Sequence, residues 1–309
     1  MKIVVLTPVF NDWDSFLTLR TNIITQYQNE HAISIVVVND CSTIPAPPEI
    51  QDSNTLIVNL KTNVGHQRAI SIGLNYIENN LNNCDLIAVM DSDGEDKPED
   101  IQVLLNQFVE NQQSKIIFAG RKKRSESLTF KLSYFFYKKI FKFLTGKTIR
   151  FGNFSVIPAH LLNRINHNPD FWNHYSGAIM KANLPYTIVD TNRGTRYAGQ
   201  SKMNINSLIL HGLSAFSLYL DNILIKFLKI GGILGLLLII AIAMLLGIKF
   251  GTNTAIPGWT SSVLIGFLNL FSTVILFLFF IILQHLNSRN KKIEAPSEFY
   301  SNYILNTQK

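Results

Sequence analysis

The strongest candidate for chemistry is an acidic run, Asp-Ser-Asp-Gly-Glu-Asp at residues 91–96, directly after the apolar stretch 86–90. Asp91 and Asp93 are one residue apart in a loop, so both carboxylates can face one hard cation. Mg²⁺ or Mn²⁺ held there with substrate phosphates would neutralise charge on a departing diphosphate. The alternative is a solvated acidic turn, since Asp12 and Asp14 form a second such pair. Placement at a predicted strand end favours the functional interpretation.

Polar residues also follow two other predicted strands. Pro8, Asn11 and Asp12 come after the stretch 2–6, and Asp40 comes after the stretch 33–38. Asp40 is predicted to accept hydrogen bonds from a nucleobase or a ribose; the alternative is an ordinary turn aspartate. Because the carboxyl ends of strands in an open α/β sheet gather at one edge, these residues predict one ligand site.

A glycine-containing turn precedes the predicted helix 67–79. Asn63 and Gly65 lie in this turn, where Gly65 permits close backbone approach and the helix N-terminus suits an anion. His66 is assigned no role. The chain has neither a GxGxxG nor a Walker A sequence, which counts against a dehydrogenase or a P-loop NTPase.

Basic residues are the candidates for contacts with phosphate. Arg121 follows the predicted strand 115–119, and Arg193, Arg196 and Lys202 lie in the segment 193–202. Guanidinium groups bind phosphate oxygens bidentately, although a solvated charge run is the alternative. Nearby membrane-facing segments favour a diphosphate or an anionic lipid as partner. The net charge is +7, but no nucleic-acid-binding motif accompanies it, so nucleic acid is not predicted as a partner.

The elements that must position these residues alternate between two patterns over residues 1–120. The predicted strands are 2–6, 33–38, 55–59, 86–90 and 115–119, and the predicted helices are 13–28, 67–79 and 98–110. Continuous apolar strands separated by helices predict a doubly wound, mostly parallel α/β sheet. We place this globular domain at residues 1–202.

Two apolar stretches predict membrane spans. Residues 230–248 and 259–283 contain no charged side chain, and runs of about 18 or more apolar residues are transmembrane candidates. We therefore predict a juxtamembrane amphipathic helix at 203–229, two transmembrane helices within 230–286 and a polar cytoplasmic tail at 287–309. The small-residue pair Gly231 and Gly235 is a candidate helix-packing face. Assembly of a homo-oligomer through the transmembrane helices is a further expectation.

The distribution of basic residues predicts the orientation in the membrane. Lys226 and Lys229 precede the first span, Arg289 follows the second, and the loop between the spans carries only Lys249. The positive-inside rule then places the globular domain and both termini in the cytoplasm, at the cell inner membrane or plasma membrane.

A basic and aromatic segment is predicted at 128–145, which contains Lys131 and no acidic residue. A helix of this composition can lie in the interface of an anionic membrane. The alternative is an aromatic core helix with a solvated lysine edge. The number of lysines and the neighbouring spans favour the interfacial interpretation.

Together these motifs resemble a known family. They are Thr7-Pro8-Val9-Phe10-Asn11, Asn39-Asp40-Cys41-Ser42, Asn63-Val64-Gly65, the acidic run with Lys97-Pro98-Glu99, Gly120-Arg121, and the segment 193–202. In this order they resemble the family 2 glycosyltransferases. The two spans resemble the membrane-anchored polyprenyl-phosphate branch, which includes dolichol-phosphate mannose synthase and GtrB-like proteins.

The resemblance implies a GT-A fold and an inverting transfer from a nucleotide sugar. It places Asp91 near the ribose and diphosphate, Asp93 on the metal, and Glu95 at a further metal-shell position. The implied nucleotide-sugar contacts are Pro8, Asn11, Asp12, Asp40, Asn63, Gly65 and Asp91. The implied contacts with the diphosphate and the lipid phosphate are Arg121, Lys131, Arg193, Arg196, Ser201 and Lys202. The implied catalytic residues are Asp91, Asp93 and Arg121.

Two positions depart from the family pattern. Relatives often carry Asp where this chain has Asn153, and Gln where it has Glu95. An asparagine cannot act as a general base. A phosphate monoester acceptor tolerates this loss, because its second pKa of about 6 leaves it largely ionised near neutral pH.

The sequence therefore predicts an enzyme that moves one sugar from a UDP- or GDP-sugar to polyprenyl phosphate at the cytoplasmic face, with Mg²⁺ or Mn²⁺. One alternative acceptor is another membrane lipid or a lipid-linked glycan. Another alternative is a non-catalytic scaffold that binds nucleotide sugars in the membrane. The intact set of Asp91, Asp93 and Glu95 favours the enzyme.

Overall fold

The computed structural model describes residues 1–50, 53–81, 83–121, 128–148, 151–198, 205–251, 258–289 and 294–308. The side chains of 121, 128–134, 205–209, 211, 288 and 289 lie outside this description. The chain divides into two compact units. The sheet unit comprises Met1–Lys138, Thr148–Leu218 and Ile293–Lys309, and the helical unit comprises Lys139–Lys147 and Tyr219–Lys292.

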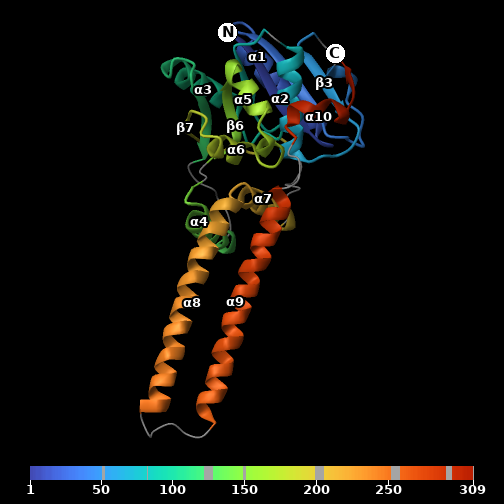
Figure 1. The fold of residues 1–309 in the computed structure, drawn as a ribbon. Helices are drawn as coiled ribbons and strands as arrows, with labels where there is room; N and C mark the ends of the chain where they lie inside the picture. Colours follow the sequence, from blue (N-terminus) through green and yellow to red (C-terminus); the bar gives the residue numbers. More distant parts are fainter. Residues whose placement is uncertain are drawn as a thin grey trace. The chain divides into compact units, whose positions relative to one another are not determined.

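One eight-stranded sheet forms the centre of the sheet unit (Figure 1). Its strands are β1 (Lys2–Val9), β2 (Ala32–Asn39), β3 (Thr55–Leu60), β4 (Leu86–Val89), β5 (Ile116–Arg121), β6 (Phe151–Pro158), β7 (Tyr186–Thr191) and β8 (Ile304–Gln308). Their spatial order is β7-β5-β6-β4-β1-β2-β3-β8. Strands β1 to β4 pair in parallel, whereas β6 runs antiparallel to both β4 and β5.

Helices cover both faces of this sheet, because its central strands are apolar on both sides. Val4 and Leu6 of β1 enter the core that holds α2 (His66–Asn80), α5 (Leu162–Asn166) and α6 (Tyr175–Lys181). Ile3 and Val5 enter the opposite core, with α1 (Trp13–Tyr27) and α3 (Pro98–Glu110). The parallel order brings the carboxyl ends of β1, β2, β3 and β4 to one edge, as the sequence predicts.

The predicted alternation is confirmed for all five strands and all three helices of residues 1–120. The predicted set lacks β6, β7 and β8. Strand β6 is inserted between β4 and β5, so it interrupts the parallel series with an antiparallel strand. No local pattern in β6 specifies that position, because it depends on pairing with strands far away in the sequence.

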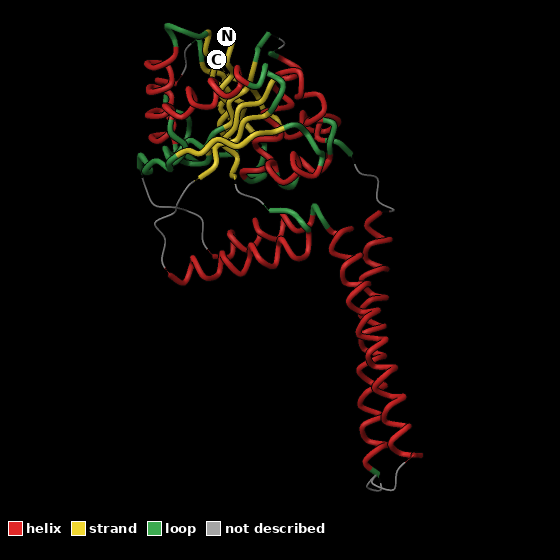
Figure 2. The backbone as a smooth tube through the Cα atoms, turned by 90° about the vertical axis from the view of Figure 1, so that its left-hand side faces the viewer, coloured by secondary structure: helices red, strands yellow, loops and turns green. Residues whose placement is uncertain are grey.

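Two long helices make up most of the helical unit, and Figure 2 shows them side by side. They are α8 (Leu220–Gly251) and α9 (Trp259–Arg289), and both are long and apolar enough to cross a membrane by length and composition. Gly231 packs against Leu278, and Gly235 packs against Phe271. The two glycines therefore lie where α8 packs against α9 within this hairpin.

The segment between the sheet and α8 differs from the single helix predicted for 203–229. Helix α7 (Ile205–Ser217) ends before Leu220, where α8 begins and continues without a break through the predicted span boundary at 230. Helix α9 likewise extends past 286 to Arg289. Residues 220–229 include Asp221, Lys226 and Lys229, so the charge-free run begins at 230, ten residues after the start of the helix.

The aromatic and basic segment forms α4 (Leu128–Thr145), as predicted. Four of its large apolar side chains are between 48% and 59% exposed: Phe135, Phe136, Ile140 and Phe143. Phe141 and Thr145 are buried instead. This exposure counts against the alternative that the segment is an aromatic core helix.

The tail after α9 is more than a polar extension. It forms α10 (Pro296–Phe299), a 3-10 turn at Tyr300–Tyr303, and β8, which pairs antiparallel with β3 at the edge of the sheet (Figure 1). Phe299 and Tyr303 pack their rings against Trp172, at centroid distances of 4.8 and 5.2 Å. The chain thus returns to the sheet unit after the two long helices.

Candidate active site

The acidic run forms a tight loop directly after β4. Asp96 accepts a hydrogen bond from the Asp91 backbone N–H at 3.0 Å, and Asp93 accepts one from the Glu95 N–H at 2.9 Å. Gly94 completes the turn with φ of +87°, a conformation that residues with a side chain rarely adopt. The carboxylates of Asp91, Asp93 and Glu95 are only 15–26% exposed, so the loop concentrates negative charge in a partly buried place.

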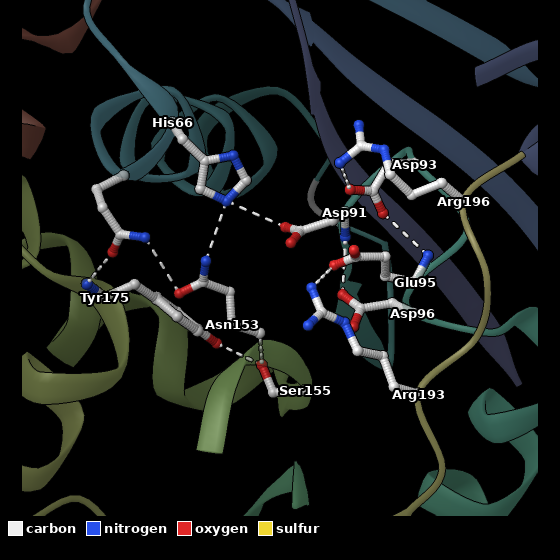
Figure 3. Close-up of polar contacts among 11 residues, drawn as sticks. His66, Asp91, Asp93, Glu95, Asp96, Asn153, Ser155, Tyr175, Arg193 and Arg196 are labelled. Carbon is white, nitrogen blue, oxygen red and sulfur yellow. Dashed lines mark hydrogen bonds and ion pairs between the residues drawn. The ribbon is translucent and has the colours of Figure 1, made fainter. Parts of the chain in front are cut away.

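The segment 193–197, named here the arginine strap, runs along this loop (Figure 3). Gly194 N–H donates to the Glu95 carbonyl and Tyr197 N–H donates to the Asp93 carbonyl, both at 2.9 Å. The Arg193 guanidinium pairs with Glu95. Backbone and side-chain contacts together therefore hold the strap against the acidic loop.

Arg196 joins the acidic loop to the end of β1. Its guanidinium lies 2.9 Å from an oxygen of Asp93 and 3.5 Å from an oxygen of Asp12. Within the described part of the chain, the Nε atoms of Arg193 and Arg196 are buried and have no hydrogen-bond partner. Each of these guanidinium groups thus keeps a donor available for a further oxygen atom.

The close approach of strap and loop requires a glycine at 194. A Cβ atom there would lie 2.3 Å from the Gly94 carbonyl oxygen, and backbone cannot move aside as a flexible side chain can. We expect Gly194→Ala to lower the stability of the fold by about 1–3 kcal/mol, as overpacking commonly does. Faster hydrogen exchange at the amides of 194 and 197 should accompany the loss. The exposed neighbour Thr195→Ala is the control, and equal behaviour of the two variants would contradict the steric argument.

Burial raises the pKa of Asp93, and the charge of Asp91 raises it further, although Arg196 and Arg193 act in the opposite direction. The net effect is that the negative charge of Asp93 is disfavoured in the structure as it stands. Additional positive charge beside Asp93 would relieve this penalty, and a bound cation supplies it.

His66, at the start of α2, contacts the acidic loop from the other side (Figure 3). Its Nε2 lies 3.0 Å from an Asp91 oxygen and 3.0 Å from Asn153 Nδ2. Desolvation lowers the pKa of His66, but the charge and hydrogen bond of Asp91, with Asp96 and Asp93, outweigh it, so the pKa is raised. His66 is a site residue that the sequence interpretation left without a role.

A chain of hydrogen bonds fixes the Asn153 amide. Tyr175 N–H donates to Gln67 Oε1 at 2.7 Å, so Gln67 Nε2 faces Asn153 Oδ1, to which it donates at 3.2 Å. The Asn153 Nδ2 group is therefore directed at His66 (Figure 3). Nothing local in the sequence marks Gln67 or Tyr175, because they meet Asn153 only in the folded sheet unit.

Asp40 has a different environment from the one its predicted role suggests. Its two carboxylate oxygens accept hydrogen bonds from the N–H groups of Val64 (2.7 Å) and Gly65 (2.9 Å). Burial raises its pKa, while these two hydrogen bonds lower it. Asn63 Nδ2 donates to the Asp40 carbonyl at 3.2 Å. Asp40 therefore holds the turn before α2, and its contact with a nucleobase stays a prediction.

Asn11 has a comparable role after β1. It adopts φ of 52°, and its Oδ1 accepts the backbone N–H groups of Thr43 (2.8 Å) and Ile44 (3.0 Å). Ser42 Oγ in turn accepts the Asn11 N–H at 2.9 Å. The loops after β1 and β2 thus form one hydrogen-bonded unit.

The structure brings six of the predicted site residues together in one cluster. Ion pairs, hydrogen bonds and charge interactions connect Asp12, Asp91, Asp93, Glu95, Arg193 and Arg196 into one cluster. Pro8 lies in β1, Arg121 ends β5 and Lys131 lies in α4, but the side chains of the last two are outside the described residues. Ser201 and Lys202 lie wholly outside them.

Two carboxylates of the acidic loop offer oxygen atoms that fit a hard divalent cation. Across the described ranges, no group of three His, Cys, Asp or Glu side chains is arranged to hold an ion. Asp91 and Asp93 are near enough for the charge of one to raise the pKa of the other, and Mg²⁺ is commonly bound by one or two carboxylates plus phosphates. Glu95 is engaged by Arg193. The fit is therefore to an ion shared between Asp91, Asp93 and a phosphorylated ligand.

Comparison with known proteins gives a consistent result. A model of the family described as "Glycosyl transferase family 2" matches residues 4–168. An uncharacterized glycosyltransferase, YkcC of Bacillus subtilis (strain 168), is 25% identical over 278 residues, covering 84% of this chain and 80% of the relative. The uncharacterized glycosyltransferase sll0501 of Synechocystis is 25% identical over 276 residues, covering 84% and 83%.

Solved structures share the fold. Glucosyl-3-phosphoglycerate synthase from Mycobacterium tuberculosis, in complex with Mn²⁺, UDP and glucosyl-3-phosphoglycerate, superposes with a TM-score of 0.52 at 12% identity, covering 72% of this chain and 79% of that one. Mannosyl-3-phosphoglycerate synthase from Rubrobacter xylanophilus superposes with a TM-score of 0.50 at 13% identity, covering 71% and 72%. The predicted mostly parallel α/β fold of the GT-A type is confirmed.

Proposed function

Because the chain belongs to glycosyl transferase family 2, we propose that it moves one sugar, with inversion, from a UDP- or GDP-sugar to polyprenyl phosphate at the cytoplasmic face of a membrane. The observation that carries this proposal is the arginine strap paired with the acidic loop at the carboxyl ends of β1 and β4. Such a site offers carboxylates and guanidinium groups within one small volume, which suits a diphosphate and its counter-ion.

The diphosphate of the donor is assigned to the strap. Arg193 and Arg196 each present a buried Nε–H that has no partner among the described residues. Guanidinium groups bind phosphate oxygens in a fixed geometry, so the two arginines would orient the leaving group. Asp12 and Asp93 hold Arg196 in place from two elements, which limits its freedom before the donor binds.

Metal dependence is also part of the proposal. The solved neighbour with UDP contains Mn²⁺, and here Asp91 and Asp93, whose charges act on one another, would offer oxygen ligands to such an ion. A divalent cation held by these two carboxylates and the donor phosphates would supply charge neutralisation for the departing nucleoside diphosphate. Mg²⁺ and Mn²⁺ both fit oxygen ligands of this kind.

Two features support a lipid phosphate as the acceptor: the asparagine at position 153 and the exposed aromatic and basic side chains of α4. Asn153 occupies the place beside His66 and has no group that can remove a proton. A phosphate monoester needs no such group: an oxygen of the acceptor attacks the anomeric carbon as the bond from that carbon to the nucleoside diphosphate breaks. The exposed aromatic side chains of α4 alternate with Lys138, Lys139 and Lys142, which suits the surface of an anionic membrane.

The two long apolar helices support a membrane location for the acceptor. Both are long and apolar enough to span a bilayer, and we propose that they do so as a hairpin. Strand β8 follows this hairpin and pairs with β3 of the sheet unit, so the hairpin would begin and end on one side of the membrane. Lysine and arginine near these ends support a cytoplasmic location for that side.

The proposal is tested by transfer from a panel of UDP- and GDP-sugars to polyprenyl phosphate, in detergent or purified membranes. We expect one donor to yield a charged glycolipid, and removal of divalent metal with EDTA to abolish the product. Mg²⁺ or Mn²⁺ added in excess should restore it. Glu99→Gln, an exposed acid outside the cluster, should behave as wild type.

Other outcomes would identify the alternatives. Transfer to a different lipid or a lipid-linked glycan, with polyprenyl phosphate inert, would overturn the proposed acceptor. Tight nucleotide binding without turnover of any donor would favour the scaffold that binds nucleotide sugars. Product formed equally well in EDTA would contradict metal dependence.

A further inference from the structure

We propose that the C-terminal segment 294–308 orients the loop after β2 for nucleotide binding, because a ladder of three asparagines connects the segment to this loop. This inference rests on the proposed function and on the prediction that Asp40, in that loop, contacts the nucleotide. Asn39, Asn59 and Asn306 are register partners on the neighbouring strands β2, β3 and β8. Register partners have side chains on the same face of a sheet, within hydrogen-bonding reach.

The ladder has a single direction of donation. Asn39 Nδ2 donates to Asn59 Oδ1, and Asn59 Nδ2 donates to Asn306 Oδ1, both at 2.8 Å. At the inner end, Asn39 Oδ1 accepts the Ser42 N–H at 3.0 Å. Each amide therefore fixes the orientation of the next, and Asn306 supplies the last acceptor.

The inner end of the ladder reaches the loop after β2, which carries Asp40. Ser42 lies two residues after Asp40, and its Oγ accepts the Asn11 N–H at 2.9 Å. Asn11 holds Thr43 and Ile44 through its side-chain oxygen. A change in the orientation of Asn39 would thus act on the loops after β1 and β2 together.

The outer end is anchored to the sheet by contacts besides the ladder. Lys61, just after β3, donates its backbone N–H to the Tyr303 carbonyl and its Nζ to the Asn302 carbonyl, both at 2.9 Å. The rings of Phe299 and Tyr303 pack against Trp172, and the guanidinium carbon of Arg68 lies 5.4 Å from the centroid of the Trp172 ring. The tail is held firmly enough to position what it contacts.

Asn306 is accordingly a positioning residue for the nucleotide, acting through Asn59 and Asn39. Its side chain is exposed at the edge of the sheet and touches no residue of the acidic loop or the strap in the described contacts. It therefore differs from the residues proposed to contact the donor. It would influence binding of the nucleotide rather than the transfer step.

The test compares three variants of the full chain. Asn306→Leu removes the acceptor at similar size, Asn306→Asp keeps an acceptor oxygen, and Thr307→Val alters the next, exposed residue of the same strand. Dissociation constants for UDP and GDP are measured, with hydrogen exchange at the Ser42 amide. We expect Asn306→Leu to raise the dissociation constant of the nucleotide that binds by roughly three- to tenfold and to speed exchange at Ser42, as loss of one hydrogen bond implies.

Asn306→Asp and Thr307→Val should behave as wild type in both measurements. The proposal is overturned if Asn306→Leu matches Thr307→Val, or if exchange at Ser42 changes while nucleotide affinity does not. A wild-type chain that binds neither UDP nor GDP would contradict the proposed function instead, and exchange at Ser42 would still report whether the ladder orders the loop.

Discussion

Replacing Asp93 by asparagine is expected to reduce kcat/KM for sugar transfer by about a hundredfold or more, without lowering the temperature of unfolding. Removing a group that stabilises charge developing in a transition state commonly has an effect of this size. Asparagine keeps the shape of the side chain and an oxygen that can accept the Glu95 N–H. It loses the negative charge that pairs with Arg196.

The stability result follows from the sign of the pKa shift. Burial and Asp91 raise the pKa of Asp93, so the folded chain holds that proton more tightly than the unfolded chain does. Stability contributed by the protonated form of Asp93 is lost as pH rises through the pKa of the folded state. At neutral pH the ionised carboxylate therefore lowers the free energy of unfolding. A neutral asparagine removes this destabilisation, so the midpoint temperature of thermal unfolding should be unchanged or higher. The check is thermal unfolding beside steady-state kinetics. Full activity in Asp93→Asn would refute the assigned role.

Asn153→Asp has the second largest expected effect, and its direction discriminates between acceptor classes. With a phosphate acceptor, we expect kcat/KM to fall about tenfold or more. A carboxylate at 153 cannot donate to His66, and it adds a like charge beside Asp91 where the anionic acceptor must approach. Gln67 can still donate to an oxygen at 153, so this variant retains one half of the amide chain.

A hydroxyl acceptor gives the opposite expectation. The new carboxylate would then act as a general base, a contribution commonly of about 10² to 10⁴ in rate. Asn153→Ala is the control, since it removes the hydrogen bonds without adding charge. A rate for Asn153→Asp above that of both the alanine variant and the wild type would overturn polyprenyl phosphate as the acceptor. A rate below both would support it.

Local patterns in the sequence predict the parallel half of the fold well. Strands β1 to β5 are short apolar runs with helices between them, and periodicity identifies such elements directly. Strand β6 depends on partners 31 to 72 residues away, and β8 on partners 244 to 251 residues away, and their own residues carry no signal of that pairing. The tail in particular is polar, and four of the five residues of β8 are exposed.

The site shows the same division. The acidic run is recognisable because Asp91 and Asp93 follow a strand at fixed spacing, and Arg193 and Arg196 are recognisable as a basic pair. The pairing of the acidic run with the two arginines is not recognisable from the sequence. It depends on the close approach of Gly194 to Gly94, which are distant along the chain. The place of His66 in the site could not be predicted either, because its contacts with Asp91 and Asn153 form only in the folded chain.

Strand β8 also sets an order of events during synthesis. Residues 304–308 leave the ribosome only after both long apolar helices, so β3 remains an open sheet edge while the hairpin is being made. Unpaired strand edges are templates for aggregation. A chain cut before α8 to obtain a soluble form would keep that edge open permanently. We expect such a truncated chain to aggregate unless residues 294–308 are joined back to it through a short linker.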